Sequence, residues 1–319
     1  MSTKVVDEKK TEKKSYDFTG KRKVFYTISI VLIALSILVS FFGVKIAIEF
    51  KGGTMITYSF IGEINSDEAK TKVEEILGTS VNIQQGDIFQ SDRKRLAISL
   101  VSNDGLTAEK QTALTTEFET IYAENEIELL DSTDVSASSG IDFFIKCIVA
   151  VAFSALILII YIALRFKRIS GWSSGICAVI ALLHDVVITY GAFVAMGFEI
   201  NSNFVAVVLT ILGCSINNTI VVYDRIRENR TLMPVEKLEK LVNYSTTQSM
   251  SRSFRTTITT VVTMIIISIV AAVSGVTSIL SFSIPICIGM IIGTYSSLCL
   301  APCLWVSWQS RSEKKSEGK

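Results

Sequence analysis

Histidine is the scarcest side chain in this 319-residue sequence, and cysteine is absent from its polar segments. The six cysteines all lie within long apolar runs, at Cys147, Cys177, Cys214, Cys287, Cys299 and Cys303. Buried free cysteines act as small packing residues, so their placement indicates neither a disulfide framework nor a metal site. The single histidine, His184, precedes Asp185, and on a helix the two side chains should diverge by about 100°. Such a pair does not form a protease dyad, and we expect neither an enzyme nor a cofactor.

Long apolar runs dominate the rest of the sequence. Hydrophobic residues make up 49% of the chain, and the mean hydropathy is +0.46. A helix needs about 20 apolar residues to cross about 30 Å of hydrocarbon. The runs therefore predict a polytopic α-helical membrane protein with six transmembrane helices: Val24–Phe42, Phe143–Leu164, Trp172–Val194, Phe204–Val222, Thr256–Val273 and Ile284–Trp305.

Lysine and arginine are missing from two short loops, residues 196–203 and residues 274–278. The alternate loops and both ends are basic, through Lys21–Lys23, Arg165–Arg168, Arg225, Arg227, Arg230, Arg311, Lys314 and Lys315. Because cytoplasmic loops carry an excess of these residues, both termini are expected in the cytoplasm. The first run exceeds the roughly 7–15 apolar residues of a signal peptide and lacks a cleavage pattern, so we expect it to be retained as a membrane helix.

These signals divide the chain into five parts. Residues 1–23 form a cytoplasmic tail, residues 24–43 the first transmembrane helix, and residues 44–140 an extracytoplasmic domain. Residues 141–308 hold transmembrane helices two to six, with a cytoplasmic loop at about 223–255, and residues 309–319 form a second cytoplasmic tail. The external part has soluble character and an acidic balance, without a catalytic constellation, so contact with another polypeptide is its expected role.

The external segment alternates strand and helix patterns. Strands are predicted at Val44–Phe50, Gly52–Phe60, Val81–Asp87, Arg93–Val101 and Ile127–Val135. Helices are predicted at Ser66–Leu77, opened by Ser66, and at Leu106–Ala123, capped by Thr107. This ββαββαβ-like order predicts a small α+β, ferredoxin-like domain with helices on one face of an antiparallel sheet.

Gly52 and Gly53 lie between the first two predicted strands. Paired glycines suit a tight turn, where positive φ or close backbone approach is needed. A phosphate cradle is the alternative, but the pattern lacks a helix start and a Lys-Ser/Thr pair. The turn is the favoured interpretation.

Asp185 lies near the middle of the apolar run Trp172–Val194 and shares a helix face with Thr189. Ionisable groups at bilayer depth are expensive and face protein or water. Two interpretations stay open for Asp185: a protonated fastener that is hydrogen-bonded to a neighbouring helix, or a group that binds and releases a proton during function. For His184 a structural role is favoured.

A second polar patch interrupts the fourth apolar run. Ser215, Asn218, Thr219 and Val222 fall on one helical face, whereas Asn217 points elsewhere. Amides in hydrocarbon need polar partners, so this face is expected against other helices or a wet cavity. Unlike a carboxyl group, the amide of Asn218 cannot carry a proton.

Charged residues follow this patch at what reads as a cytoplasmic helix end. Asp224, Arg227 and Glu228 can pair at i+3 and i+4 spacing, with Arg225 between them. Arg252 then lies close to the start of the fifth apolar run. Arginines in such positions anchor a helix at the membrane interface by default.

Five motifs, in this order, resemble the SecF family of bacterial protein-export membrane proteins, the smaller half of the SecD/SecF pair. They read GKRKVFYTISIVLI, IEFKGGT, ALLHDVVIT, SINNTIVVYDRIREN and QSMSRSFRTTITT. The resemblance covers the chain from roughly Asp17 to Trp308. Its most specific part is the run Ser215–Asn229.

The resemblance implies an auxiliary subunit of the Sec translocase in the bacterial cytoplasmic membrane, built as half of an RND-type transporter. Together with SecD it would use the proton-motive force, or another ion gradient, to promote preprotein translocation and release. The implied partners are SecD, the SecYEG translocon, YajC, a YidC-type insertase, unfolded preprotein and membrane lipids, with no nucleic acid. The six spans show no internal repeat, which independently calls for a second chain to complete a twofold transporter.

The chain departs from the family pattern at one position. Family members commonly read Ser-Ile-Asn-Asp-Thr where this chain has Ser215–Thr219, so Asn218 replaces the acid associated with ion passage. Arg252 matches the arginine of the family's Gln-x-x-Ser-Arg pattern. The expected ion-coupling residues are therefore Asp185, Asn218 and Arg252, supported by His184, Ser215, Asn217, Thr219, Asp224, Arg225, Gly52 and Gly53.

Three explanations of the substitution remain open. Proton carriage rests on Asp185 and SecD, the coupling ion differs, or the subunit is a scaffold that holds SecD at the channel. A standalone exporter of lipids or small molecules is a further alternative, although a single six-span half disfavours it.

Overall fold

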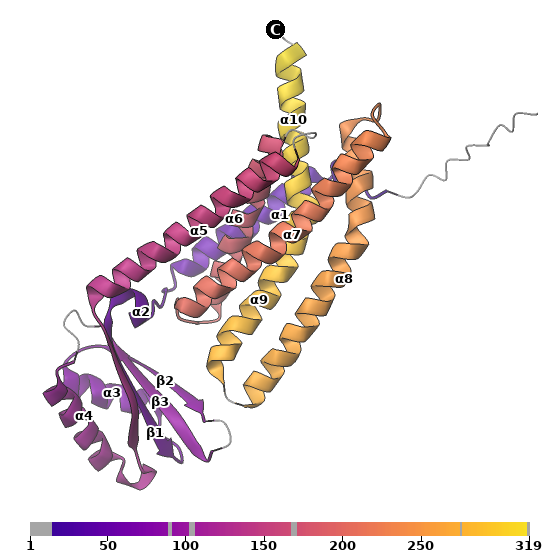
Figure 1. The fold of residues 1–319 in the computed structure, drawn as a ribbon. Helices are drawn as coiled ribbons and strands as arrows, with labels where there is room; N and C mark the ends of the chain where they lie inside the picture. Colours follow the sequence, from indigo (N-terminus) through magenta and orange to yellow (C-terminus); the bar gives the residue numbers. More distant parts are fainter. Residues whose placement is uncertain (1–14, 89–90, 102–105, 167–170, 275, 318–319) are drawn as a thin grey trace, which may run out of the picture.

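The computed structural model describes residues 15–88, 91–101, 106–166, 171–274 and 276–317, and it shows a helical bundle with a small sheet domain at one end (Figure 1). In these residues six helices are long and apolar enough to cross a membrane, which confirms the six predicted spans. They are α1 (Arg22–Ser40), α5 (Ala137–Arg165), α6 (Gly171–Ala195), α7 (Ser202–Leu232), α8 (Leu238–Val273) and the continuous pair α9 (Thr277–Tyr295) and α10 (Ala301–Glu317).

A π-helical turn, Ser296–Leu300, joins α9 to α10, which leaves the bundle at the end opposite the sheet domain (Figure 1). We call the two ends the sheet-domain end and the C-terminal end. The predicted basic loop Arg165–Arg168 and the predicted loop 274–278 lie partly outside the described residues, as does most of the predicted N-terminal tail.

Three of the six spans form the centre of the bundle. In their most apolar windows, α6, α7 and the α9–α10 span have 56%, 50% and 61% of their residues buried, against 11% in each of α1, α5 and α8. The outer helices direct large apolar side chains outward, for example Ile30, Phe153 and Ile269. Polar groups enclosed by α6, α7 and α9 must therefore be satisfied within the bundle, because hydrocarbon offers no hydrogen bonds.

Helix α1 meets α6 at Gly191. A Cβ atom at this position would lie 2.3 Å from the Ser36 hydroxyl oxygen and 2.7 Å from the Ser36 Cα. Lipid tails provide no hydrophobic drive between helices, so small residues that permit close packing stabilise their association. Gly191 thus sets the distance between α1 and the central helix α6.

The sheet domain follows α1 and has the ferredoxin-like order βαββαβ. Its strands are β1 (Gly53–Ile61), β2 (Val81–Asp87), β3 (Arg93–Leu100) and β4 (Glu128–Val135), and its helices are α3 (Ser66–Leu77) and α4 (Ala108–Ile121). A short 3₁₀ turn, Ala123–Asn125, precedes β4. The strands pair antiparallel in the order β2-β3-β1-β4. The fully buried core contains Ile56, Tyr58, Phe60, Ala69, Val73, Leu96, Ile98, Leu114 and Phe118.

The predicted first strand, Val44–Phe50, is wrong. Ile46 forms only an isolated bridge to Ile200, and the chain then turns into the short helix α2 (Ile48–Lys51). Phe50 is buried there against two phenylalanine rings at the start of α5. Packing against a membrane helix therefore overrides the alternating pattern that favours a strand.

The glycine pair joins α2 to β1, and both residues have positive φ angles, 81° for Gly52 and 145° for Gly53. A Cβ atom on Gly53 would lie 2.1 Å from the carbonyl oxygen of Leu100. The pair therefore makes a turn with close backbone approach, although a helix rather than a strand precedes it.

The two helices of the sheet domain begin near their predicted positions. Helix α3 starts at Ser66, but the capping side chain belongs to Asn65, whose Oδ1 accepts from the Asp67 backbone N–H. Helix α4 follows Thr107, whose side chain makes no capping hydrogen bond. Helix position was therefore easier to predict than capping chemistry.

The segment before α1 is held against α8 by Asp17 and Asn243. Asn243 Oδ1 accepts hydrogen bonds from the backbone N–H groups of Phe18 and Thr19 at 3.1 and 2.9 Å, and its Nδ2 donates to Asp17 at 2.9 Å. The hydrogen bond from the Gly20 backbone N–H, followed by the one from Asn243, lowers the pKa of Asp17 from its ordinary value. The N-terminal segment thus docks through charge-assisted hydrogen bonds.

Gly191→Ala is expected to lower the free energy of unfolding by about 1–3 kcal/mol, because the added methyl group must push α1 away from α6. Thermal unfolding of the purified chain in detergent measures this change. Gly213→Ala is the matched control, since no atom lies within 4 Å of a Cβ placed there. Equal stability of the two variants would contradict the assigned role of Gly191.

Lowering the pH is expected to release the N-terminal segment from α8. The folded-state pKa of Asp17 is depressed, so its stabilising effect is present above the ordinary pKa of 3.8 and is lost as the pH falls through the lower folded value. Hydrogen exchange of the Phe18 and Thr19 amides, corrected for intrinsic rates, should therefore accelerate below about pH 4. Asp17→Asn should flatten this dependence; persistence of the full dependence would exclude Asp17 as its source.

Candidate functional site

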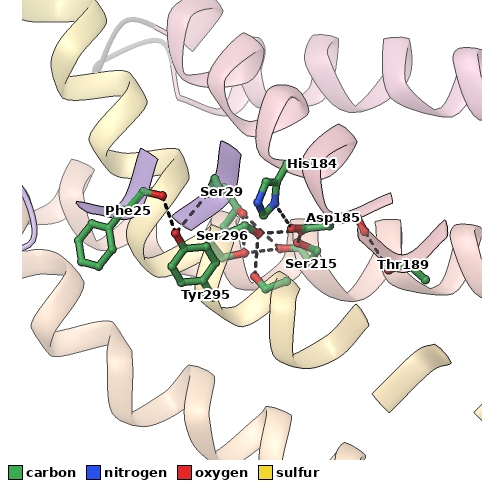
Figure 2. Close-up of polar contacts among 11 residues, drawn as sticks. Phe25, Ser29, His184, Asp185, Thr189, Ser215, Tyr295 and Ser296 are labelled. Atoms are coloured by element: carbon green, nitrogen blue, oxygen red, sulfur yellow. Dashed lines mark hydrogen bonds and ion pairs between the residues drawn. The ribbon is translucent and has the colours of Figure 1, made fainter. Parts of the chain in front are cut away.

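Asp185 lies at the centre of a buried cluster of hydroxyl groups from three segments (Figure 2). Its side chain is fully buried on α6. Its Oδ2 accepts a hydrogen bond from Ser215 Oγ of α7 at 2.6 Å and another from Ser296 Oγ of the π-helical turn at 2.7 Å. Gly293 allows this approach, because a Cβ there would lie 3.1 Å from the Ser215 side chain. The three central spans therefore converge on one carboxyl group.

His184 completes the cluster from the same helix as Asp185. Its Nδ1 lies 3.0 Å from Asp185 Oδ1, and the ring is buried. The expectation that these two side chains diverge is therefore wrong, because the imidazole reaches the neighbouring carboxyl group directly. The other ring nitrogen, Nε2, is buried without a hydrogen-bond partner in the described residues, and the Tyr295 ring lies 6.2 Å away between centroids.

The hydroxyl groups can satisfy Asp185 in either protonation state. Ser296 Oγ carries one proton but has two acceptors in reach, Asp185 Oδ2 at 2.7 Å and the Gly293 carbonyl oxygen at 3.1 Å. When Asp185 is ionised, Ser296 donates to the carboxylate. When Asp185 is protonated, the carboxyl O–H donates to Ser296 Oγ, and Ser296 turns its own proton to Gly293. Each arrangement leaves these polar groups with a hydrogen-bond partner, so the exchange avoids an unsatisfied donor or acceptor, while the ionised form still bears the cost of a buried charge.

Hydroxyl groups continue from Asp185 toward the C-terminal end of the bundle. Thr219, one turn beyond Ser215 on α7, donates from Oγ1 to Ser297 Oγ at 2.9 Å. On the other side of His184, the Tyr295 hydroxyl donates to the Phe25 carbonyl at 2.8 Å and lies 3.2 Å from Ser29 Oγ (Figure 2). The cluster therefore reaches α1 as well as the three central spans.

Apolar side chains separate Asp185 from the sheet-domain end. Val207 and Ile211 of α7 pack with Ile286 and Met290 of α9, and all four are buried. These residues precede Ser215 and Ser296 on helices that run away from the sheet domain. Thr189 of α6 lies one turn from Asp185 on this side, and its hydroxyl donates to the Asp185 backbone carbonyl at 2.8 Å. Beyond Thr219 and Ser297, buried apolar residues such as Val222, Ile226 and Val306 fill the C-terminal side as well. In the conformation described, apolar packing therefore encloses the cluster on both sides.

The predicted polar face of α7 is confirmed in its burial. Ser215, Asn218, Thr219 and Val222 have exposed fractions of 4% or less, whereas Asn217 is exposed. Ser215 and Thr219 make the hydrogen bonds to neighbouring segments, and Asn218 lies between them in sequence without joining the Asp185 cluster. Asn218 is therefore enclosed beside the cluster, while Asn217 presents an amide outward near the middle of a membrane helix.

Arg252 is exposed on α8 and lies outside the Asp185 cluster. The position of Arg252 relative to α7 follows from hydrogen bonds between α7 and α8 near the C-terminal end of the bundle. There Arg225 Nε donates to Gln248 Oε1 at 2.5 Å, and Asn229 Nδ2 donates to Ser245 Oγ at 2.8 Å. These pairs define an antiparallel register, and one further turn places Arg252 beside the turn of α7 that follows Asn218.

Ion pairs fix the charged end of α7. Arg227 lies 2.6 Å from Asp224, which confirms the i+3 pair expected from the sequence. Arg225 lies 2.6 Å from Glu228. Asp224 also approaches Arg165 at the end of α5, at 3.3 Å. These residues therefore tie helices together at a distance from Asp185 and do not take part in its hydrogen bonding.

Sequence reasoning missed Ser296 and Tyr295. Both lie within the predicted span Ile284–Trp305, where the run Thr-Tyr-Ser-Ser interrupts the apolar residues. The signal was therefore present as four consecutive hydroxyl groups near the middle of a membrane helix. Single π-helical turns of this kind often occur at functional sites.

Comparison with known proteins gives the family. Residues 114–311 match the family model described as protein export membrane protein SecD/SecF, C-terminal. The protein translocase subunit SecF of Petrotoga mobilis is 33% identical over 302 residues, which cover 93% of this chain and 97% of that protein. SecF of Thermobaculum terrenum is 32% identical, with 92% and 94% of the two chains covered.

Longer relatives match this chain over part of their own length. The protein translocase subunit SecDF of Bacillus subtilis is 29% identical over 97% of this chain but only 40% of its own length. The crystal structure of SecDF from Thermus thermophilus, a translocon-associated membrane protein, matches with a TM-score of 0.78 and 28% identity, covering 93% of this chain and 39% of that one. These relatives are named as translocase subunits and not as enzymes. The chain belongs to the SecF family of protein translocase subunits.

Proposed function

We propose that this chain is an auxiliary subunit of the bacterial Sec translocase in which Asp185 takes up and releases a proton to promote preprotein translocation and release. The observation that carries this proposal is the alternative acceptor for Ser296. A purely structural fastener needs one hydrogen-bond arrangement, whereas the Asp185 cluster offers a complete one for each protonation state. Moving one charge through 100 mV supplies about 2.3 kcal/mol, so a single carrier is a useful source of work.

A SecD-type chain would complete the route. Asn217 and Arg252 are exposed on α7 and α8, where an amide and a guanidinium group are costly if lipid covers them. The register of the two helices brings Arg252 to the level of the turn of α7 that follows Asn218. In the SecDF relatives the two halves form one chain. This supports a second half-transporter that packs against Asn217 and Arg252 on α7 and α8.

The orientation follows from the basic loops. Both termini would lie in the cytoplasm and the sheet domain on the outer face of the cytoplasmic membrane, where emerging preprotein is within its reach. Hydroxyl groups extend about one turn from Asp185 toward the cytoplasm, to Thr219 and Ser297, before buried apolar residues close the bundle, so a proton would leave only when this packing opens. SecYEG, YajC, a YidC-type insertase and membrane lipids are further partners that family membership implies.

A structural scaffold that holds SecD at the channel is the second candidate. One feature favours it: where the resemblance to SecF leads us to expect an acid, this chain has the amide of Asn218, which does not join the Asp185 cluster. The two candidates differ in whether Asp185 titrates during export. A standalone exporter of lipids or small molecules lacks comparable support.

Asp185→Asn is expected to reduce gradient-dependent export to background while leaving assembly with the SecD-type partner intact. The amide keeps an oxygen that can accept from Ser215 and Ser296, but it cannot take up a proton. Preprotein import into inverted membrane vesicles, with and without a proton gradient, measures the effect. Asp142→Asn, an exposed change near the start of α5, is the matched control. Unchanged export and unchanged gradient dependence in Asp185→Asn would favour the scaffold.

Asn218→Asp is expected to be tolerated or to raise export, since the position is enclosed beside the cluster and about one turn from the level of Arg252. The same vesicle assay measures export, and co-purification of the SecD-type partner measures assembly. Asn217→Asp, on the exposed neighbouring residue, should give no gain. Misfolding of Asn218→Asp, or loss of its partner, would count against a shared ion site between α7 and α8.

A further inference from the structure

The two edges of the external sheet differ in what covers them. The edge strand β2 faces the loop between α6 and α7, where the Asn82 side chain donates a hydrogen bond to Glu199. The opposite edge strand, β4, pairs with β1 on one side, and no strand in the described residues pairs with its other side. Six of its eight residues are exposed. An edge of this kind presents unpaired backbone N–H and C=O groups to another chain.

A groove lies along helix α4 and reaches β4 at Leu129. It has a volume of about 440 Å³, and its lining includes Gln111, Thr112, Thr115, Thr116, Glu119 and Leu129. Helix α4 buries only Leu114 and Phe118 in the domain core, so polar side chains, three of them threonines between Gln111 and Glu119, face the groove. A strand edge beside a helix is the construction that several peptide-binding domains use to take an extended peptide as an additional strand.

Exposed leucines and unpaired acids mark the same edge. Leu129 and Leu130 have exposed fractions of 42% and 52%. Asp131 of β4 and Glu119 of α4 form no ion pair in the described residues, whereas Glu128 is paired with Arg93 at 3.2 Å. Acidic residues on an edge strand can simply deter aggregation. Here Glu119 lines the groove beside Leu129, whereas Asp131 pairs with Thr57 and lies on the opposite sheet face, next to a β-bulge. A segment with apolar side chains toward the groove and basic side chains toward the opposite face would complement both faces.

We propose that the β4 edge binds an extended segment of an exported polypeptide as a fifth strand, with alternate side chains of that segment in the α4–β4 groove. Backbone hydrogen bonds supply affinity without a fixed sequence, as a subunit that meets many clients requires. The occupant's identity rests on the proposed export function. Helix α4 lies on the side of the sheet domain away from α9 (Figure 1).

The test uses the full chain in lipid nanodiscs and a fluorescein-labelled twelve-residue peptide of alternating valine and lysine. A matched peptide carries N-methyl groups on alternate residues, which removes one row of backbone donors and keeps every side chain. Fluorescence anisotropy should show binding weakened by about fivefold or more for the methylated peptide. Hydrogen exchange should show new protection of β4 amides when the unmodified peptide binds.

Charge dependence is tested with Asp131→Lys, which should weaken binding by about two- to fivefold. Asp92→Lys, at the exposed end of the β2–β3 connection, makes the same charge change away from the groove and should leave binding unchanged. Equal binding of the two peptides, an equal effect of the two variants, or β4 protection that depends on protein concentration without peptide would each overturn the proposal. The assay requires no ion gradient, so its failure is distinct from failure of Asp185 as a proton carrier.

Discussion

The need to satisfy a carboxyl group inside a hydrocarbon environment organises this molecule. Asp185 is fully buried, and its partners come from its own helix, from α7 and from the turn after α9. A displaced helix would leave polar groups unpaired where water cannot replace the missing hydrogen bonds. The same contacts that hold the three central spans together therefore also define the state of the group that we propose to carry the proton.

The rest of the bundle is consistent with a polar centre formed by three spans and an apolar periphery formed by the other three. Helices α1, α5 and α8 surround the centre with apolar faces, and glycines at the closest contacts allow the backbones to approach. Buried apolar residues enclose the cluster on both sides, Val207, Ile211, Ile286 and Met290 toward the sheet domain and Val222, Ile226 and Val306 toward the C-terminal end. Under the proposed function, proton entry and exit would each require one of these layers to open, favoured by the partner half or by the client.

The sequence predicted the architecture well, because its strongest signals are physical requirements of a bilayer. Run length identified the spans, and helical periodicity placed Ser215, Asn218 and Thr219 on a buried face with Asn217 outside it. Local patterns failed where packing against a distant segment decides the secondary structure. The alternating pattern of Val44–Phe50 predicted a strand, but Phe50 packs against α5 and the chain forms the short helix α2 there.

Side-chain contacts were harder to predict than helix faces. Helical geometry alone did not reveal that His184 reaches Asp185, because the contact depends on side-chain rotation. Ser296 was hidden within an apolar run, since its role depends on a π-helical turn and on the approach of two other helices. Arg252 matched a family motif, yet its side chain lies outside the cluster. The motif therefore predicted which helices lie near the site, but not which side chains contact Asp185.

Infrared difference spectroscopy of the purified chain, together with its SecD-type partner in lipid, can observe the proton on Asp185 directly. The carbonyl stretch of a protonated carboxyl group is distinct from the bands of a carboxylate, and Asp185→Asn identifies the contribution of this residue. Our account predicts a band that appears and disappears with pH in the wild-type complex and is missing from the variant. A band from Asp185 that stays constant at every pH at which the complex supports export would show a fixed structural fastener and contradict the account.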